Sequence, residues 1–213
     1  LLAARYRNLA QPRAKRAAAK VEVGDRRRFV YAGFGDGGEP RVVDATAIYM
    51  GARAVAWVQD DMRPAADNLS REEIAAVVEQ FNREDFALAA AAFGQASDVD
   101  GDGRIAFLFT HWVDDEEGIA GFYDASSALP VEAGGDGNMT DLMFVSPTQS
   151  LDFYRSLLVH EFQHLINFNE HVLVRRGAAE ESWLNEGLSH LAEDLVSGYS
   201  ESGQDDNIAA YLR

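Results

Sequence analysis

The segment that most limits the fold of this chain is residues 150–168, SLDFYRSLLVHEFQHLINF, because its pattern suits a long amphipathic helix. Ser150 is a favourable N-cap, and Asp152 places a negative charge in the first turn. The residues of its apolar face, which would anchor it in a core, are Leu158, Phe162, Leu165 and Ile166. His160 and His164 stand four apart, so they project from another face one turn apart. The fold must therefore bury one side of this helix and hold two imidazoles together.

Two histidines at this spacing can bind one metal ion, and the five residues His160 to His164 read HEFQH. The chain has no cysteine, so a transition metal must be held by histidines and carboxylates. Glu161 cannot easily reach the same ion, but it can reach a water beside it, where hydrolysis needs a general base. The pattern favours a zinc hydrolase site, although HExxH also arises by chance on ordinary helices.

A catalytic zinc site needs a third protein ligand from a second rigid element. The segment Ser182–Glu193, SWLNEGLSHLAE, is predicted to begin a helix that runs to about Ser197, and it contains Glu186. Glu180 and Glu181 compete for the role, but they lie before the expected start of this helix. The residues alone leave this choice open.

WLNEGLSHLAE resembles the third-ligand helix of gluzincin metallopeptidases, which reads close to WLNEGFASYxE in the membrane-alanyl aminopeptidases. HEFQHLINF, the 21 residues between His164 and Glu186, and DVDGDGRIAFLF upstream are most similar to the bacterial hyicolysin-like family of secreted gluzincins. The match covers roughly residues 70–197. It implies Zn²⁺ bound by His160, His164 and Glu186, Glu161 as the catalytic base, and peptide hydrolysis.

Other residues near these motifs are weaker candidates for a role in the site. Glu193 aligns with the last Glu of the aminopeptidase motif and would either orient a ligand or be a solvated helix charge. His190 would be an ordinary core histidine or an outer partner of the site. His111 and His171 lack partners at ligand spacing and are excluded. The donors considered for stabilising a tetrahedral oxyanion are Tyr199, Tyr211 and Arg213.

An acidic loop, DVDGDGRI from Asp98 to Ile105, has the early features of a calcium site. Oxygen donors stand at Asp98, Asp100 and Asp102, a glycine follows, and Arg104 would add its backbone carbonyl. The usual bidentate Glu is missing, because that position is a phenylalanine. The residues considered for completing a Ca²⁺ site are Asp114, Asp115, Glu116 and Asp141. An Asp/Gly-rich turn without an ion is the alternative.

The remaining pattern predicts an α+β fold. A helix is expected over 70–93, broken near Asn82–Asp85, since Ser70 and Glu73 form a capping box. The segments with strand character are Arg28–Ala32, Arg41–Val43, Thr46–Tyr49, Ala54–Val58, Arg104–Thr110 and Asp141–Ser146. With the resemblance, this gives a zincin-like metallopeptidase domain, in which a twisted sheet, a backing helix, the HExxH active-site helix and a third-ligand helix follow a short β-rich segment. Its expected divisions are a basic linker or pro-segment remnant (1–28), the β-rich segment (29–66) and the catalytic domain (67–213).

Charge limits the partners. The formal net charge is -16 although residues 1–28 hold nine Lys/Arg and two Asp/Glu, so the body would repel a nucleic acid backbone. No stretch is long and apolar enough to cross a membrane. We expect a protein or peptide substrate, and the resemblance and the calcium loop suggest an extracellular or cell-envelope location in a bacterium.

Three functional alternatives stay open beside a secreted endopeptidase. An aminopeptidase would need a Glu for the substrate amine, but the GxMEN motif of that family is replaced by GNMTD at 137–141. A catalytically silent surface or adhesion module would not need Glu161. A calcium-dependent binding domain would make HEFQH accidental. For an endopeptidase, we expect extended substrate to pair with Asp141–Ser146 as an edge strand.

Overall fold

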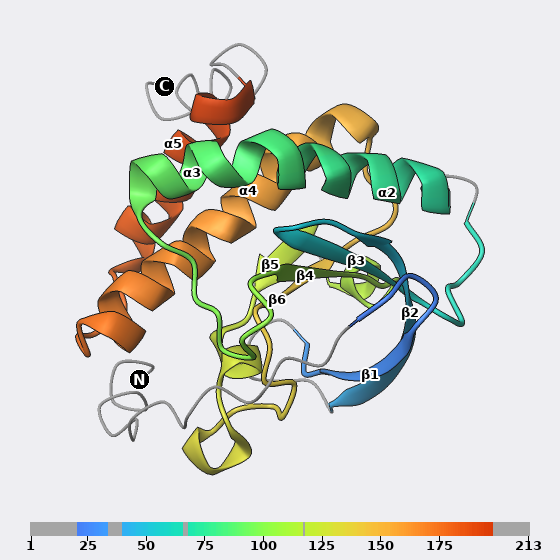
Figure 1. The fold of residues 1–213 in the computed structure, drawn as a ribbon, viewed down its shortest axis with the longest axis horizontal. Helices are drawn as coiled ribbons and strands as arrows, with labels where there is room; N and C mark the ends of the chain where they lie inside the picture. The colour runs from blue at the N-terminus through green and yellow to red at the C-terminus, as the bar shows by residue number, and fades with distance from the viewer. Residues whose placement is uncertain (1–20, 34–39, 66–67, 117, 198–213) are drawn as a thin grey trace.

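A six-stranded mixed sheet lies at the centre of this α+β fold, in the order β1-β2-β3-β4-β6-β5 (Figure 1). The computed structural model describes residues 21–33, 40–65, 68–116 and 118–197. β4 is parallel to β3 and β6, and the other neighbouring strands pair antiparallel. The strands are β1 (Arg26–Tyr31), β2 (Arg41–Met50), β3 (Ala54–Gln59), β4 (Ile105–Phe109), β5 (Gly121–Tyr123) and β6 (Leu142–Val145).

The central strands are apolar on both faces, since every residue of β3, β4 and β6 is buried. Such continuous apolar runs are typical of strands covered on both sides. The strands expected at 104–110 and 141–146 are confirmed as β4 and β6. The pieces expected at 41–43 and 46–49 belong to one strand, β2, which has a bulge between Ala47 and Tyr49.

Helices cover one face of this sheet (Figure 1). α2 (Arg71–Gln80) begins at the Ser70 and Glu73 capping box, and a π-helical turn (Phe81–Asp85) joins it to α3 (Phe86–Phe93). The break expected near Asn82–Asp85 is therefore present as a π-helical turn. α4 (Leu151–Phe168) continues into a second π turn (Asn169–Val174), and α5 (Ser182–Ser197) packs on α4. None of the helices in the described ranges is both long and apolar enough to span a membrane.

A second apolar core fills the other face, because the sheet curls until its two ends meet. The ring of Tyr31 in β1 lies 5.9 Å from that of Phe122 in β5 and 5.2 Å from that of Phe144 in β6, both edge-on. The Tyr31 hydroxyl donates to Glu116, in the segment that leads to β5. Each face of the sheet thus has its own core, and the first is shared with α2, α3 and α4.

The two outermost strands of the sheet, β1 and β5, have different surroundings. The side chain of Asn138 accepts a hydrogen bond from the N–H of Val30 and donates one to its carbonyl, both at 2.8 Å, which satisfies part of the outer edge of β1. β5 forms the other edge. The expectation that Asp141–Ser146 is an edge strand is wrong, because β5 pairs with β6 and covers it. β3 pairs with β4, so strands from 29–66 and from the later segment share one sheet. Residues 1–20 lie outside the described ranges.

Candidate metal centre

Two adjacent helices bring the predicted ligands together. His160 and His164 project from the same side of α4, with ring centroids 4.8 Å apart. Oε2 of Glu186, on α5, lies 3.4 Å from Nε2 of His160 and 3.7 Å from Nε2 of His164. The imidazoles are 16% and 13% exposed, whereas the Glu186 side chain is 52% exposed. The group is therefore mostly buried but open on the Glu186 side.

Glu193 contacts His160 through Nδ1 of the imidazole. Its Oε1 lies 2.7 Å from Nδ1 of His160 and 2.7 Å from Nδ1 of His190. Its side chain is 8% exposed, so Glu193 is not a solvated helix charge. A carboxylate that accepts the Nδ1 proton fixes the ring tautomer and leaves Nε2 free as a ligand atom. His160, His190 and Glu193 also have ligand atoms within 4.8 Å of one another, as do His160, His164 and Glu186.

A buried polar cluster orients His164. Oγ of Ser189 lies 3.0 Å from its Nδ1 and donates to Oε1 of Gln163 at 2.7 Å. The side chain of Asn167 in α4 donates a hydrogen bond to that of Asn185 in α5, which adds another contact between the two helices. Ser189 and Gln163 were not singled out from the sequence. Both residues are uncharged and lie in helices, so the sequence gives no sign of their role. Only the packing of α4 on α5 shows that they lie beside His164.

Glu161 contacts the edge strand β5 through its carboxylate. Its Oε2 accepts a hydrogen bond of 2.8 Å from the backbone N–H of Tyr123 in β5. Gly121 lets β5 lie close to β6 and α4, because a Cβ atom there would lie 3.1 Å from the carbonyl oxygen of Phe144 and 3.3 Å from Cδ1 of Leu157. Glu161 is only 5% exposed, and burial raises its pKa to about 7. A carboxyl group with such a pKa can both accept and return a proton near neutral pH.

The charges of the cluster favour one cation. Burial lowers the pKa of His160, but its hydrogen bonds with Glu186 and Glu193 outweigh burial and raise the pKa to about 10. Burial and the neighbouring His160 charge lower the pKa of His164 to about 4. The hydrogen bond from His160 lowers the pKa of Glu186. The carboxylates therefore attract one positive charge to His160, while His164 stays neutral, as a metal ligand must be.

The acidic loop is only partly assembled as predicted. Asp98 and Asp100 have carboxylate oxygens within 4.8 Å of Asp141, one of the four residues considered for completing the site. Asp141 is fully buried, and its carboxylate accepts hydrogen bonds from Ser97 and from the N–H of Val99. Asp102 lies outside this group of three, and its Oδ1 accepts the N–H of Arg104 at 2.7 Å.

The other residues weighed from the sequence lie apart from the candidate centre. Asp115 pairs with Arg63. Glu180 lies 2.7 Å from His171 and is not near the ligand group, so it does not compete with Glu186. Nδ1 of His111 accepts the backbone N–H of Arg63 at 3.2 Å. The oxyanion donors that the sequence suggested, Tyr199, Tyr211 and Arg213, are outside the described residues.

Comparison with known proteins identifies no family for this chain. No protein family model matches the chain, and no curated protein matches it. The candidate centre is therefore interpreted from its own geometry and chemistry.

Proposed function

We propose that this chain is a zinc-dependent peptidase with a zincin-type site, as its resemblance to the gluzincins implies. One observation carries the proposal: a single oxygen of Glu186 lies 3.4 and 3.7 Å from the Nε2 atoms of His160 and His164. Ligands about 2.0–2.1 Å from a tetrahedral zinc ion lie about 3.3–3.5 Å from each other. The two distances from Glu186 to the histidines are thus close to the spacing that zinc requires, and all three ligand atoms lie within 4.8 Å of one another.

The donor set also suits zinc. Two imidazoles and one carboxylate form a common ligand set of catalytic zinc, and a bound metal ion would take the place of the proton that the carboxylates hold on His160. The half-exposed Glu186 leaves one side of the group accessible. Glu193 and Ser189 lie at the Nδ1 atoms of His160 and His164, where partners orient metal-binding histidines. When bound, zinc supplies a Lewis acid that polarises a carbonyl and acidifies water.

In this proposal Glu161 moves the proton. Its carboxylate accepts a proton from the attacking water and later delivers that proton to the leaving nitrogen of the cleaved peptide bond. Its burial and its hydrogen bond from Tyr123 N–H hold it between α4 and the edge strand. The same hydrogen bond marks where a substrate beside β5 would meet the proton acceptor.

An endopeptidase is favoured because β5, the last strand in the order of the sheet, lies beside Glu161. Phe122 lies opposite Phe144 in the ladder, and the Tyr123 N–H points out of the sheet toward Glu161. A peptide added to this edge can extend beyond the site in both directions. An aminopeptidase would instead release amino-acyl reporters faster than internally quenched peptides.

The test compares zinc-loaded wild type with Glu161→Ala and Glu161→Gln in casein hydrolysis. Both variants should keep zinc and their melting temperature but lose activity by about 10²–10⁴-fold, the share that a positioned proton acceptor contributes. Glu132→Gln, a change at an exposed position remote from the ligand group, is the matched control. Unchanged activity in the Glu161 variants would contradict the mechanism. Zinc binding without hydrolysis by wild type would favour the silent surface module.

A further inference from the structure

The connection between α4 and α5 joins the helix that carries the two histidines to the helix that carries Glu186. After the π turn that ends at Val174, the chain has neither helix nor strand over residues 176–181. All residues from 174 to 179 are exposed, and Val174 is 62% exposed. They read VRRGAA, two adjacent arginines followed by three small residues. Exposed connections of small and polar residues are preferred sites of cleavage by peptidases.

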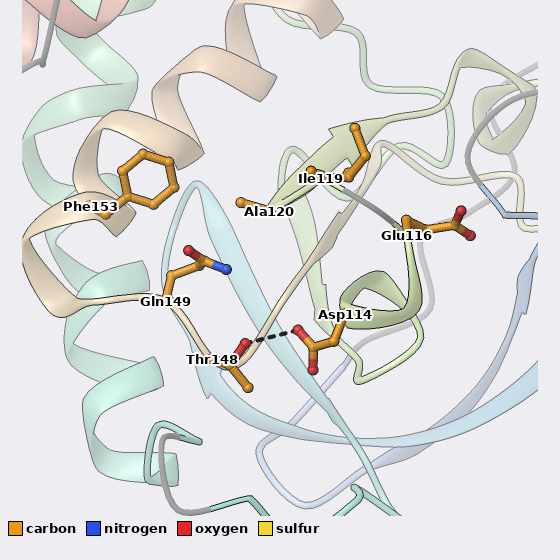
Figure 2. Close-up of a pocket in the computed structure, with 8 residues that line it drawn as sticks. Asp114, Glu116, Ile119, Ala120, Thr148, Gln149 and Phe153 are labelled. Carbon is orange, nitrogen blue, oxygen red and sulfur yellow. Dashed lines mark hydrogen bonds between the residues drawn. The ribbon is translucent and has the colours of Figure 1, made fainter. Parts of the chain in front are cut away.

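The connection that enters α4 is fastened by hydrogen bonds and shows the contrast. In Figure 2, Thr148 lies beside Asp114, whose carboxylate accepts a hydrogen bond of 3.0 Å from the Thr148 hydroxyl. The N–H of Gln149 donates to the hydroxyl of Tyr154, a buried residue of α4. Thr148 and Gln149 line a pocket at the start of α4. This connection is thus held in place, and it contains no lysine or arginine.

Two points of the connection between α4 and α5 contact His171, in the π turn after α4. The carbonyl of His171 accepts the N–H of Gly177 at 2.8 Å, and its Nδ1 lies 2.7 Å from Oε1 of Glu180. Both contacts bridge the two arginines, since His171 precedes them and the other two residues follow them. α5 begins at Ser182, close to the second contact. The two helices are therefore tied together by more than the peptide bonds between them.

The two arginines of the connection are weakly held. Nη2 of Arg175 lies 3.8 Å from Oε2 of Glu170, and the Arg175 side chain is 64% exposed. Within the described ranges, the side chain of Arg176 has no hydrogen bond or ion pair. Its backbone has a φ of 55°, a left-handed conformation that is unfavourable for a residue with a Cβ atom. Opening this segment into the extended shape that a peptidase binds therefore relieves strain and breaks few contacts.

The other arginines in the described part of the chain are better protected. Those ranges contain no lysine, and most of their arginines lie in strands or helices, where hydrogen bonds fix the backbone. Three more lie outside these elements. Arg53 lies over the ring of Phe86, and Arg63 pairs with Asp115. Arg104 donates to two backbone carbonyls. The arginine pair after α4 is therefore the most accessible basic site in these ranges.

We propose that Arg175 and Arg176 form a site of limited proteolysis, at which a peptidase of trypsin-like specificity cuts the chain between the two histidines and Glu186. The cut hydrolyses the peptide bond after one of the arginines. It consumes one water and leaves a new carboxyl group on the arginine and a new amino group on the next residue. The site would make the metal centre a target for regulation by a second peptidase.

The cut chain keeps α5 on α4 through contacts that do not involve the connection. Ala192 and Val196 are buried in the core that α5 shares with α4, and Glu193 contacts His160. Glu186 would then be joined to the histidines only by such noncovalent contacts. Zinc should therefore leave the cut protein more easily than the intact protein. This consequence rests on the proposed function, whereas the cleavage site itself does not.

The test treats the full chain with a trace of trypsin under native conditions and identifies the pieces by mass spectrometry. Among the bonds of the described ranges, the first to be cut should be the one after Arg175 or the one after Arg176. The double substitution Arg175→Gln and Arg176→Gln should remove this cut while keeping polar side chains at both positions. Arg71→Gln, at the exposed start of α2, is the matched control and should leave the cut unchanged.

Transfer of zinc to a chromophoric chelator measures the consequence for the metal centre. The cut protein should release zinc about 10-fold faster than the intact protein, because its third ligand has lost the covalent link to the other two. A first cut elsewhere in the described ranges would overturn the site, and so would an unchanged cut in the double variant. Equal zinc release before and after the cut would overturn the effect on the metal centre. If the intact protein binds no zinc, the proposed function fails, and the map of cut bonds still decides the site.

Discussion

Oε1 of Glu193 lies 2.7 Å from Nδ1 of His160 and equally close to Nδ1 of His190. One carboxylate oxygen therefore joins two imidazoles, one from α4 and one from α5. Nε2 of His160 also lies 3.4 Å from Oε2 of Glu186. If His160 binds the proposed zinc ion, Glu193 is the residue that orients its ring.

Replacing Glu193 by Gln should weaken zinc binding by about 10–100-fold, as the loss of such partners does elsewhere. The amide can still contact Nδ1, but it lacks the negative charge that makes the imidazole a better donor. Competition with a chromophoric chelator measures the affinity. Glu132→Gln, at an exposed position, should bind zinc like wild type, and an equal loss in both variants would contradict a specific role for Glu193.

Two groups of three ligand atoms share His160, and two substitutions distinguish them. If zinc is held by His160, His164 and Glu186, Glu186→Ala should abolish stoichiometric zinc in the purified protein, whereas His190→Ala should retain it. Elemental analysis after dialysis gives the zinc content. The reverse pattern would move the metal to His190 and Glu193 and remove the basis of the proposed mechanism.

The sequence predicted much of the helical part of this centre. His160, His164 and Leu158 take their places from the 3.6-residue period of one helix, which depends only on local spacing. The role of Glu193 could not be decided, because a contact between α5 and α4 depends on how two helices pack. Ser189 was missed for the same reason.

The sheet was less predictable from local pattern. β4 and β6 are continuous apolar runs, and both were expected within a residue or two of their observed bounds. β5 was missed, since it has only three residues and begins with Gly121 in a segment of turns. That omission made β6 look like an edge strand. The pairing of β3 with β4 joins residues about fifty positions apart, which no local pattern shows.

The calcium prediction has a test in thermal stability. Asp98, Asp100 and Asp141 have oxygens close together, and a bound cation would offset their mutual repulsion. Calcium at ten times its dissociation constant would add about 1.4 kcal/mol, which raises the melting temperature by about 3–5 °C in a chain of this size. Magnesium should have less effect, because it fits flexible oxygen sites poorly.

Asp98→Asn should remove most of that calcium response, and Asp44→Asn, on the exposed side of β2, should keep it. Asp98 is preferred to Asp141 as the test position, since Asp141 also bonds Ser97 and Val99 in the interior. No rise in melting temperature at millimolar calcium would favour a turn without an ion.

The last prediction concerns the ion pair that joins the π turn after α2 to α4. Asp85 is 1% exposed, and Arg155 donates to its Oδ1 from Nη2 at 3.0 Å and from Nε at 3.2 Å. Burial raises the pKa of Asp85, and Arg155 opposes this rise. Arg155→Met should destabilise the protein by about 2–3 kcal/mol near pH 7.5, because it leaves a buried carboxylate without its cation.

The sign of the pH dependence follows from the same pair. Without Arg155, the pKa of folded Asp85 rises further above its unfolded value, so the folded state binds more protons over that window. Stability of Arg155→Met should therefore be nearest to wild type below about pH 4 and fall as the pH rises through the folded pKa. Asp85→Asn in the same background should remove this extra slope and recover part of the lost stability. Urea unfolding between pH 4 and 8 measures both effects, and a variant whose deficit is constant over this range would show that Arg155 acts by packing and not by charge.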